Sequence, residues 1–205
     1  LGAFEQFPWL FSTYLLAQAV SVPIYAKLGD TVGRKPIILV GVGLFLAGSV
    51  LCCLAWDMTA LIIFRIVQGL GAGAVAPMSM TIVGDIYSVE ERAQVQGYIA
   101  GVWAASSVIG PALGWLFSQF ASWRWIFFVN IPLCLVAGWA LLRSYHEVVE
   151  SRRHRIDYPG AVVLTIGLTA LILALLQGGN AWPWVSWPSL AAIGIGVLAL
   201  AVFPA

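Results

Sequence analysis

The stretch LIIFRIVQGLGAGAVAPMSM, residues 61–80, decides the fold of this chain. It is an apolar run of about 20 residues, the length that a helix needs to cross a bilayer. Near its start it nevertheless carries one full positive charge, on Arg65. A charged side chain inside a spanning helix costs roughly 2.5 kcal/mol or more, so such residues face a bundle interior or a wet cavity. The stretch therefore predicts a membrane helix with a functional residue at Arg65.

Polar and small residues share one face of this predicted helix. Gln68 and Gly69 follow Arg65 at offsets of three and four, which places them on the same side of a helix. Gly69, Gly73 and Pro77 recur at four-residue spacing. The two glycines would let a neighbouring helix approach closely, and Pro77 could bend this one. A polar stripe among small residues favours a solvated cavity over lipid.

The composition is that of a membrane protein without catalytic chemistry. Of 205 residues 61% are hydrophobic and 9% charged, whereas a soluble domain has about 25% charged residues. A net charge of +1 argues against nucleic acid as a partner. The two histidines, His146 and His154, lie in a polar stretch away from any convergent set of catalytic groups. We expect no enzyme activity, no metal site and no cofactor.

Seven apolar segments of near-spanning length divide the chain, and none alternates as a barrel strand would. They cover residues 8–26, 36–55, 59–83, 93–120, 125–142, 158–177 and 188–203. The sequence therefore predicts an all-α, polytopic membrane bundle. Basic residues concentrate in the loops at residues 27–35, 92 and 143–155, which we place in the cytoplasm. Residues 144–157 are expected to form a polar linker, or alternatively a charged run on anionic lipid. The tryptophan-rich loop at residues 178–189 is expected on the outer interface.

The first cytoplasmic loop, residues 26–36, is expected to be a tight reversal. Gly29 and Gly33 would permit the turn, and Pro36 suits the first turn of the next helix. Asp30 would then lie near the N-terminus of that helix and gain from its dipole.

Charges of opposite sign are expected to meet at this cytoplasmic end. Arg34 or Lys35 could pair with a carboxylate such as Asp85, which closes the helix of residues 59–83 and precedes Arg92. A pair that forms in one state and breaks in another is what a gate requires. The alternative is a helix cap with solvated charges. The predicted gate comprises Asp30, Gly33, Arg34, Lys35, Asp85 and Arg92.

Three stretches of the sequence resemble motifs of the major facilitator superfamily. Residues 26–35, AKLGDTVGRK, resemble its cytoplasmic signature G-x-L-x-D-x-x-G-R-[RK], with Ala26 in place of the first glycine. Residues 61–74, LIIFRIVQGLGAGA, look like its fourth-helix pattern L-x-x-x-R-x-x-Q-G-x-G-x-A. Residues 123–132, WRWIFFVNIP, are similar to the W-R-W-I-F-x-x-N-x-P run of the fourteen-helix drug:proton antiporters.

A fourth motif lies in the predicted helix at residues 93–120. This helix is similar to the antiporters' fifth-helix pattern G-x8-G-x3-G-P-x-x-G-G, with departures at Ser106 and Trp115. The positions concerned are Gly97, Gly101, Ser106, Gly110, Pro111 and Gly114. Independently of any family, Pro111 frees the carbonyl of Ser107, so the helix should bend there. The glycines offer small surfaces for close helix packing. The resemblance implies a role in antiport, which is to seal the cavity against ion leak.

The resemblance implies a division of the chain into three parts. Residues 1–143 would form the N-terminal transporter half without its first helix, residues 144–157 a cytoplasmic linker, and residues 158–205 two further helices that join the halves. On this mapping the chain is a fragment covering helices two to eight of a fourteen-helix protein. Its partners would then include the missing first helix and C-terminal half of the same protein.

The resemblance implies a proton-coupled exporter of amphipathic small molecules in a bacterial cytoplasmic membrane, working by alternating access around Arg65, Gln68 and Gly69. Its partners would be the substrate, protons and membrane lipid. The alternatives are a uniporter or symporter of a polar nutrient, or a lipid-handling membrane protein. No acidic residue falls in the middle of a predicted span. The carrier of the coupling proton is therefore expected outside this chain, and the resemblance implies an aspartate in the upstream helix.

Overall fold

The computed structural model describes residues 6–146, 158–179 and 182–202. Within these ranges the regular structure is helical apart from one isolated bridge between Gly178 and Trp182. The helices are α1 (Phe7–Val32), α2 (Arg34–Leu54), α3 (Met58–Ile86), α4 (Val89–Phe120), α5 (Trp125–Phe128), α6 (Asn130–Ser144), α7 (Tyr158–Gln177) and α8 (Trp187–Val202). The predicted all-α architecture is confirmed. Most of the linker predicted at residues 144–157 lies outside the described residues.

The helices match the seven expected membrane segments, and α7 and α8 have the lengths that the sequence predicts. Five segments are long and apolar enough to cross a bilayer, and α5 and α6 together make the fifth, Trp125–Ser144. Helix α8 is a shorter apolar helix, and α7 is apolar from Val162 to Gln177. The fifth span is interrupted at Val129, between α5 and α6. Pro132 explains the break, because it cannot donate a hydrogen bond to the carbonyl of Phe128.

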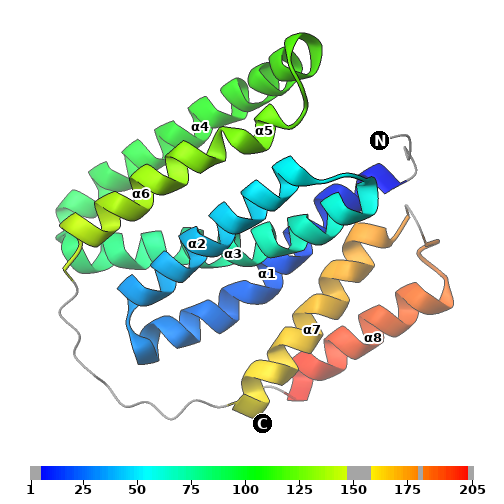
Figure 1. Ribbon diagram of the computed structural model, residues 1–205. Helices are drawn as coiled ribbons and strands as arrows, with labels where there is room; N and C mark the ends of the chain where they lie inside the picture. The colour runs from blue at the N-terminus through cyan, green and yellow to red at the C-terminus, as the bar shows by residue number, and fades with distance from the viewer. Residues whose placement is uncertain (1–5, 147–157, 180–181, 203–205) are drawn as a thin grey trace.

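The first three helices form the central layer, in which α3 packs against both α1 and α2 (Figure 1). Glycines allow the close contact with α2. A Cβ atom added to Gly71 would lie 2.6 Å from the carbonyl oxygen of Gly41 and would also meet the backbone of Phe45. On the α1 side, a Cβ at Gly73 would meet Ser21. The expectation that glycines of α3 admit a neighbouring helix is confirmed, for α1 as well as α2.

Helices α7 and α8 form an antiparallel hairpin that packs against α1 (Figure 1). Their own contact is also close, since a Cβ at Gly167 would lie 2.9 Å from Cβ of Ala199. The turn between them includes Gly179, whose φ of 76° favours glycine. Trp184 covers Gly178 and Gly179. The expected position of this loop on a membrane interface stays a prediction.

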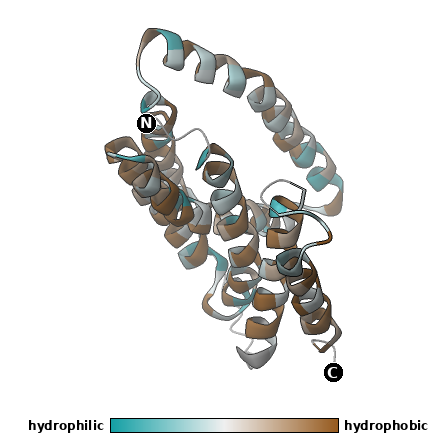
Figure 2. Ribbon diagram, turned by 90° about the vertical axis from the view of Figure 1, so that its right-hand side faces the viewer, coloured by the Kyte–Doolittle hydropathy of each residue, from teal (hydrophilic) through white to brown (hydrophobic). Residues whose placement is uncertain are grey.

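Helix α4 is set apart from the rest of the molecule. Its N-terminus has a capping box, in which Ser88 accepts from the backbone of Glu91 and Glu91 accepts from the backbone of Ser88. None of its residues is buried, and Trp103 and Trp115 are largely exposed. Figure 2 shows this long helix as a bowed arc that stands away from the other helices. A specific bend at Pro111 stays a prediction.

Candidate functional site

Arg65 lies in the second turn of α3 and is half-buried between α1 and α3. Its guanidinium makes two directed hydrogen bonds. Nε donates to the carbonyl oxygen of Leu10 at 3.3 Å, and Nη1 donates to Oε1 of Gln68 at 2.7 Å. The first bond reaches across to α1 and the second follows the helical spacing of three residues. The sequence prediction that Arg65 and Gln68 share a face is thereby confirmed.

Aromatic rings stabilise the same charge. The guanidinium carbon lies 4.1 Å from the ring centre of Tyr14 on α1 and 5.8 Å from that of Phe127 on α5. Such cation–π contacts contribute about 0.5–2 kcal/mol, and more where water is excluded. In the part of the chain that the structure describes, the one ion pair involves other residues, so no carboxylate neutralises Arg65. Its charge is held by carbonyl and amide oxygens and by π faces.

Gln68 continues the polar chain into the interior. Its side chain is only 1% exposed, and Nε2 donates to Oγ of Ser49 at 2.8 Å. Ser49, on α2, is fully buried and donates to the carbonyl oxygen of Phe45 at 2.8 Å. Ser49 was missed by sequence reasoning, because a serine in an apolar helix gives no sign of which neighbour it faces. The one signal in the sequence was the adjacent Gly48, since a glycine can mark a close contact between helices. The structure shows that contact, because a Cβ at Gly48 would meet the backbone of Gln68.

Gly69 is placed at the contact between α3 and α1. A Cβ there would lie 2.5 Å from the carbonyl oxygen of Tyr14 and 3.0 Å from Cβ of Ala17. The residue therefore sets the separation of the two helices at the level of Arg65. Its predicted role beside a cavity stays a prediction.

The opposite end of α3 carries the predicted ion pair. Arg34, the first residue of α2, pairs with Asp85, the penultimate residue of α3, and both side chains are partly exposed. This is the partner that the sequence suggested for Arg34 or Lys35. The use of the pair as a gate stays a prediction.

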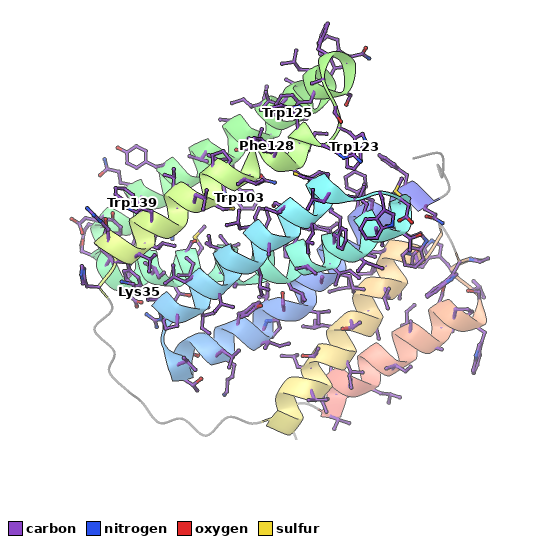
Figure 3. All side chains as sticks on the ribbon, in the orientation of Figure 1. Lys35, Trp103, Trp123, Trp125, Phe128 and Trp139 are labelled. Carbon is purple, nitrogen blue, oxygen red and sulfur yellow. The ribbon has the colours of Figure 1, made fainter. Side chains whose placement is uncertain are left out.

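Lys35 binds a different helix from Arg34. Its Nζ donates to the carbonyl oxygen of Leu142 at 3.2 Å and to that of Tyr145, at the C-terminal end of α6. Figure 3 shows Lys35 at the end of the molecule opposite to Trp123. A cation suits this position because the last carbonyls of a helix carry partial negative charge. Adjacent cations thus join the start of α2 to the ends of α3 and α6.

Arg92 also binds carbonyl groups. Its Nε donates to the carbonyl oxygen of Tyr87 at 3.0 Å, and its Nη2 donates to the carbonyl oxygen of Gly84. Both carbonyl groups lie at the C-terminal end of α3. The guanidinium is therefore a cap for α3, and it belongs to the same end of the molecule as Arg34 and Lys35.

The prediction for Asp30 is wrong in its local structure. Helix α1 continues to Val32, and the reversal is confined to Gly33, whose φ is 109°. Asp30 consequently lies in the last turn of α1 and is exposed, instead of near the N-terminus of α2. A carboxylate there is disfavoured by the dipole of its own helix. Gly29 likewise lies inside α1, where a Cβ would be 2.8 Å from Sδ of Met78.

The antiporter-like positions of α4 face open space. No atom would lie within 4 Å of a Cβ built at any of the four glycines, Gly97, Gly101, Gly110 and Gly114. Ser106 and Pro111 are exposed as well. The described residues therefore provide no packing partner for this face, and its role in antiport stays a prediction.

Carboxylates lie at helix ends throughout the described ranges. Asp57 is the N-cap of α3 and accepts from the backbone of Ala60 at 2.6 Å, while Glu90 and Glu91 lie in the first turn of α4. Asp30 and Asp85 lie in the last turns of α1 and α3. None of these five residues is within the middle of a span.

Comparison with known proteins places these features in a family. The model of the Major Facilitator Superfamily matches residues 1–157. The chain is 40% identical over 91% of its length to Multidrug resistance protein 3 of Bacillus subtilis (strain 168). It is 34% identical over 99% of its length to Multidrug transporter protein MdtP of the same organism, and 37% over 99% to Efflux pump FUS6 of Gibberella moniliformis. It spans about 36–38% of the length of these relatives.

Proposed function

Since this chain belongs to the Major Facilitator Superfamily, we propose that it forms part of a proton-coupled exporter of amphipathic small molecules. It is a multi-pass membrane protein and not an enzyme. The similar proteins are named as multidrug or efflux transporters, which supports export as the direction of transport. The basic end of the molecule, with Lys35 and Arg92, would face the cytoplasm.

The polar chain from Arg65 through Gln68 to Ser49 carries this proposal. A desolvated cation is costly inside a span, and here it is retained without a carboxylate among the described residues. An arginine cannot release its proton at physiological pH, so it cannot carry the coupling proton itself. It can lower the pKa of a nearby carboxyl group by roughly 1–3 units and so set when that group releases its proton. Arg65 would act in this way on an acid outside the described residues.

Alternating access requires contacts that differ between two states. The ion pair between Arg34 and Asp85 is partly exposed and joins two helix ends, so it can open without burying an unpaired charge. In the proposed cycle it stabilises the state in which this end is closed.

The proposal is tested by substrate uptake into proteoliposomes that contain the full-length transporter and have an acidic lumen. A lipophilic fluorescent cation serves as substrate, and a pH gradient is the sole driving force. We expect accumulation that stops when the gradient is collapsed with nigericin. The Arg65→Ala variant should insert normally and lose accumulation. Gradient-driven accumulation by Arg65→Ala at the wild-type rate would remove Arg65 from the mechanism, and accumulation that persists without a gradient would refute proton coupling.

A further inference from the structure

The hydrogen bonds around Gln68 can be arranged in one way only. The guanidinium of Arg65 has donors and no acceptor, so the group of Gln68 that faces it must be the carbonyl oxygen Oε1. The amide nitrogen of Gln68 therefore faces Ser49 and donates to its hydroxyl oxygen. The hydroxyl proton is left to bond the carbonyl oxygen of Phe45. These three hydrogen bonds form a series from Arg65 to Gln68, to Ser49 and to the backbone of α2. Arg65 at one end and that backbone at the other fix which group donates in each bond.

Ser49 links that backbone to the side chains of Gln68 and Arg65. The hydroxyl is fully buried, and Gln68 is nearly so. Water therefore has no ready access to replace the bond if the hydroxyl is removed. Without the hydroxyl, one N–H of the Gln68 amide would be unsatisfied, so rotation of this side chain toward another acceptor would be favourable. Arg65 would then lose its acceptor at 2.7 Å.

We propose that Ser49 is a positioning residue, which holds the guanidinium of Arg65 in its working place through Gln68. The inference rests on the proposed function, because the position of Arg65 matters only if its charge acts on a proton-binding group. Ser49 itself touches neither the substrate nor the proton. Its contribution is to orient one amide so that the arginine is held on α3 as well as on Leu10 of α1.

The test measures the pH dependence of efflux in proteoliposomes with the full-length transporter. In Ser49→Ala the guanidinium is less well held, so its effect on the nearby carboxyl group weakens and the pKa of that group rises. The midpoint of the pH profile should therefore move toward alkaline pH by about half a unit, a fraction of the roughly 1–3 units that an adjacent arginine can cause. Ser49→Thr, which keeps the hydroxyl, should restore the wild-type midpoint.

Ser21 provides a matched control. It is also buried, at 3% exposure, and its hydroxyl bonds only to the backbone, at the carbonyl oxygens of Gln18 and Leu70. Ser21→Ala removes a similar group from the same helix layer without touching the Arg65 chain. It should leave the midpoint unchanged even if it lowers the amount of folded protein.

A double variant separates positioning from packing. If Ser49 acts through Gln68, Ser49→Ala added to Gln68→Ala should not shift the midpoint further. An equal shift in both backgrounds would overturn the proposal, as would a wild-type midpoint in Ser49→Ala or an equal shift in Ser21→Ala. If Ser49→Ala fails to fold, Ser49→Cys takes its place, because it keeps the volume and weakens the hydrogen bond.

The same assay distinguishes this inference from the proposed function. Transport that persists without a pH gradient would overturn the proposed function, and an unchanged profile in Arg65→Ala would remove Arg65, and Ser49 with it, from the mechanism. A changed profile in Arg65→Ala together with an unchanged one in Ser49→Ala would overturn the role of Ser49 alone.

Discussion

At the scale of single residues, the position of Arg65 suits an arginine specifically. Its planar group makes two bonds in different directions, to Leu10 and Gln68, and lies 4.1 Å from the ring centre of Tyr14. A lysine has a compact charge and no planar face for stacking. The structure therefore uses the shape of the guanidinium as well as its charge.

Replacing Arg65 by lysine should therefore uncouple transport without removing the charge. We expect Arg65→Lys to insert and fold, but to lose most pH-driven efflux, because one ammonium group cannot hold the carbonyl of Leu10 and Oε1 of Gln68 in the same geometry. The measurement is efflux rate at equal amounts of membrane protein. Wild-type efflux in Arg65→Lys would show that charge alone suffices.

Helical spacing allowed Gln68 to be predicted, whereas the partners on other helices could not be predicted because only tertiary structure brings them to Arg65. Gln68 lies three residues after Arg65, so one helix was enough to place them together. Ser49 and Tyr14 belong to α2 and α1, and no local pattern joins them to α3. Asp30 was misplaced because Gly29 and Gly33 suggested a reversal that includes it, whereas α1 continues to Val32 and only Gly33 forms the turn.

At the scale of helices, the contact between α2 and α3 depends on the absence of side chains at a few points. Gly71→Ala should destabilise the bundle, because the new Cβ would lie 2.6 Å from the carbonyl oxygen of Gly41. Overpacking of this kind typically costs about 1–3 kcal/mol. The measurement is thermal unfolding of the full-length protein in detergent.

Gly84 is the matched control for this prediction, since it is in the same helix and nothing lies within 4 Å of a Cβ built there. Gly84→Ala should leave the midpoint of unfolding unchanged or raise it slightly. Equal effects of the two substitutions would contradict the close α2–α3 contact.

The ion pair between Arg34, at the start of α2, and Asp85 leads us to expect that exchanging the two charges restores function. Arg34→Asp or Asp85→Arg alone should lower transport, and the double variant should recover part of it, because the pair is re-formed in reverse. A partly exposed pair contributes up to about 1 kcal/mol, so each single change should alter the ratio of the two states by roughly fivefold or less. Accessibility of cysteines introduced on either side of the membrane measures this ratio.

Glu90 supplies the control for the exchange. It is an exposed acid in the first turn of α4. Combining Arg34→Asp with Glu90→Arg should give no recovery. Recovery there would mean that net charge, and not the contact with Asp85, matters at this end.

Because α4 packs against so little of the described structure, we expect substitutions on it to reduce transport without disturbing the fold. Gly110→Leu should not disturb the packing of the described helices, since the position faces open space. It should nevertheless reduce transport more than Pro111→Ala, because a bulky side chain prevents another helix from approaching that surface. Equal efflux in Gly110→Leu and wild type, at matched expression, would show that this face contacts lipid.

Span positions could be predicted from the sequence because hydropathy and length determine them. The interruption at Val129 was missed, since the apolar run continues through it and only Pro132 marks the break. The isolation of α4 could not be predicted either. Its glycines indicate that something packs closely, but a spacing pattern does not say which helix.

At the scale of the whole molecule, the two ends of the bundle differ in charge. Lys35, Arg34 and Arg92 gather at one end, where they bind the termini of α3 and α6. Arg124, at the other end, donates to the carbonyl oxygens of Cys53 and Ala55. Because the positive charges predominate at the first end, we expect it to be cytoplasmic. Labelling of single cysteines near each end in intact cells would determine the orientation.

Exchange of substrate for protons is the central claim, and reciprocity tests it most directly. In an antiporter each gradient can drive the other flux. Proteoliposomes with the full-length transporter are loaded with substrate at equal internal and external pH, then diluted into substrate-free buffer while internal pH is recorded. The account predicts that protons enter as substrate leaves, and that Arg65→Ala abolishes this proton movement. Downhill substrate flux with no change of internal pH in the wild-type protein would contradict it.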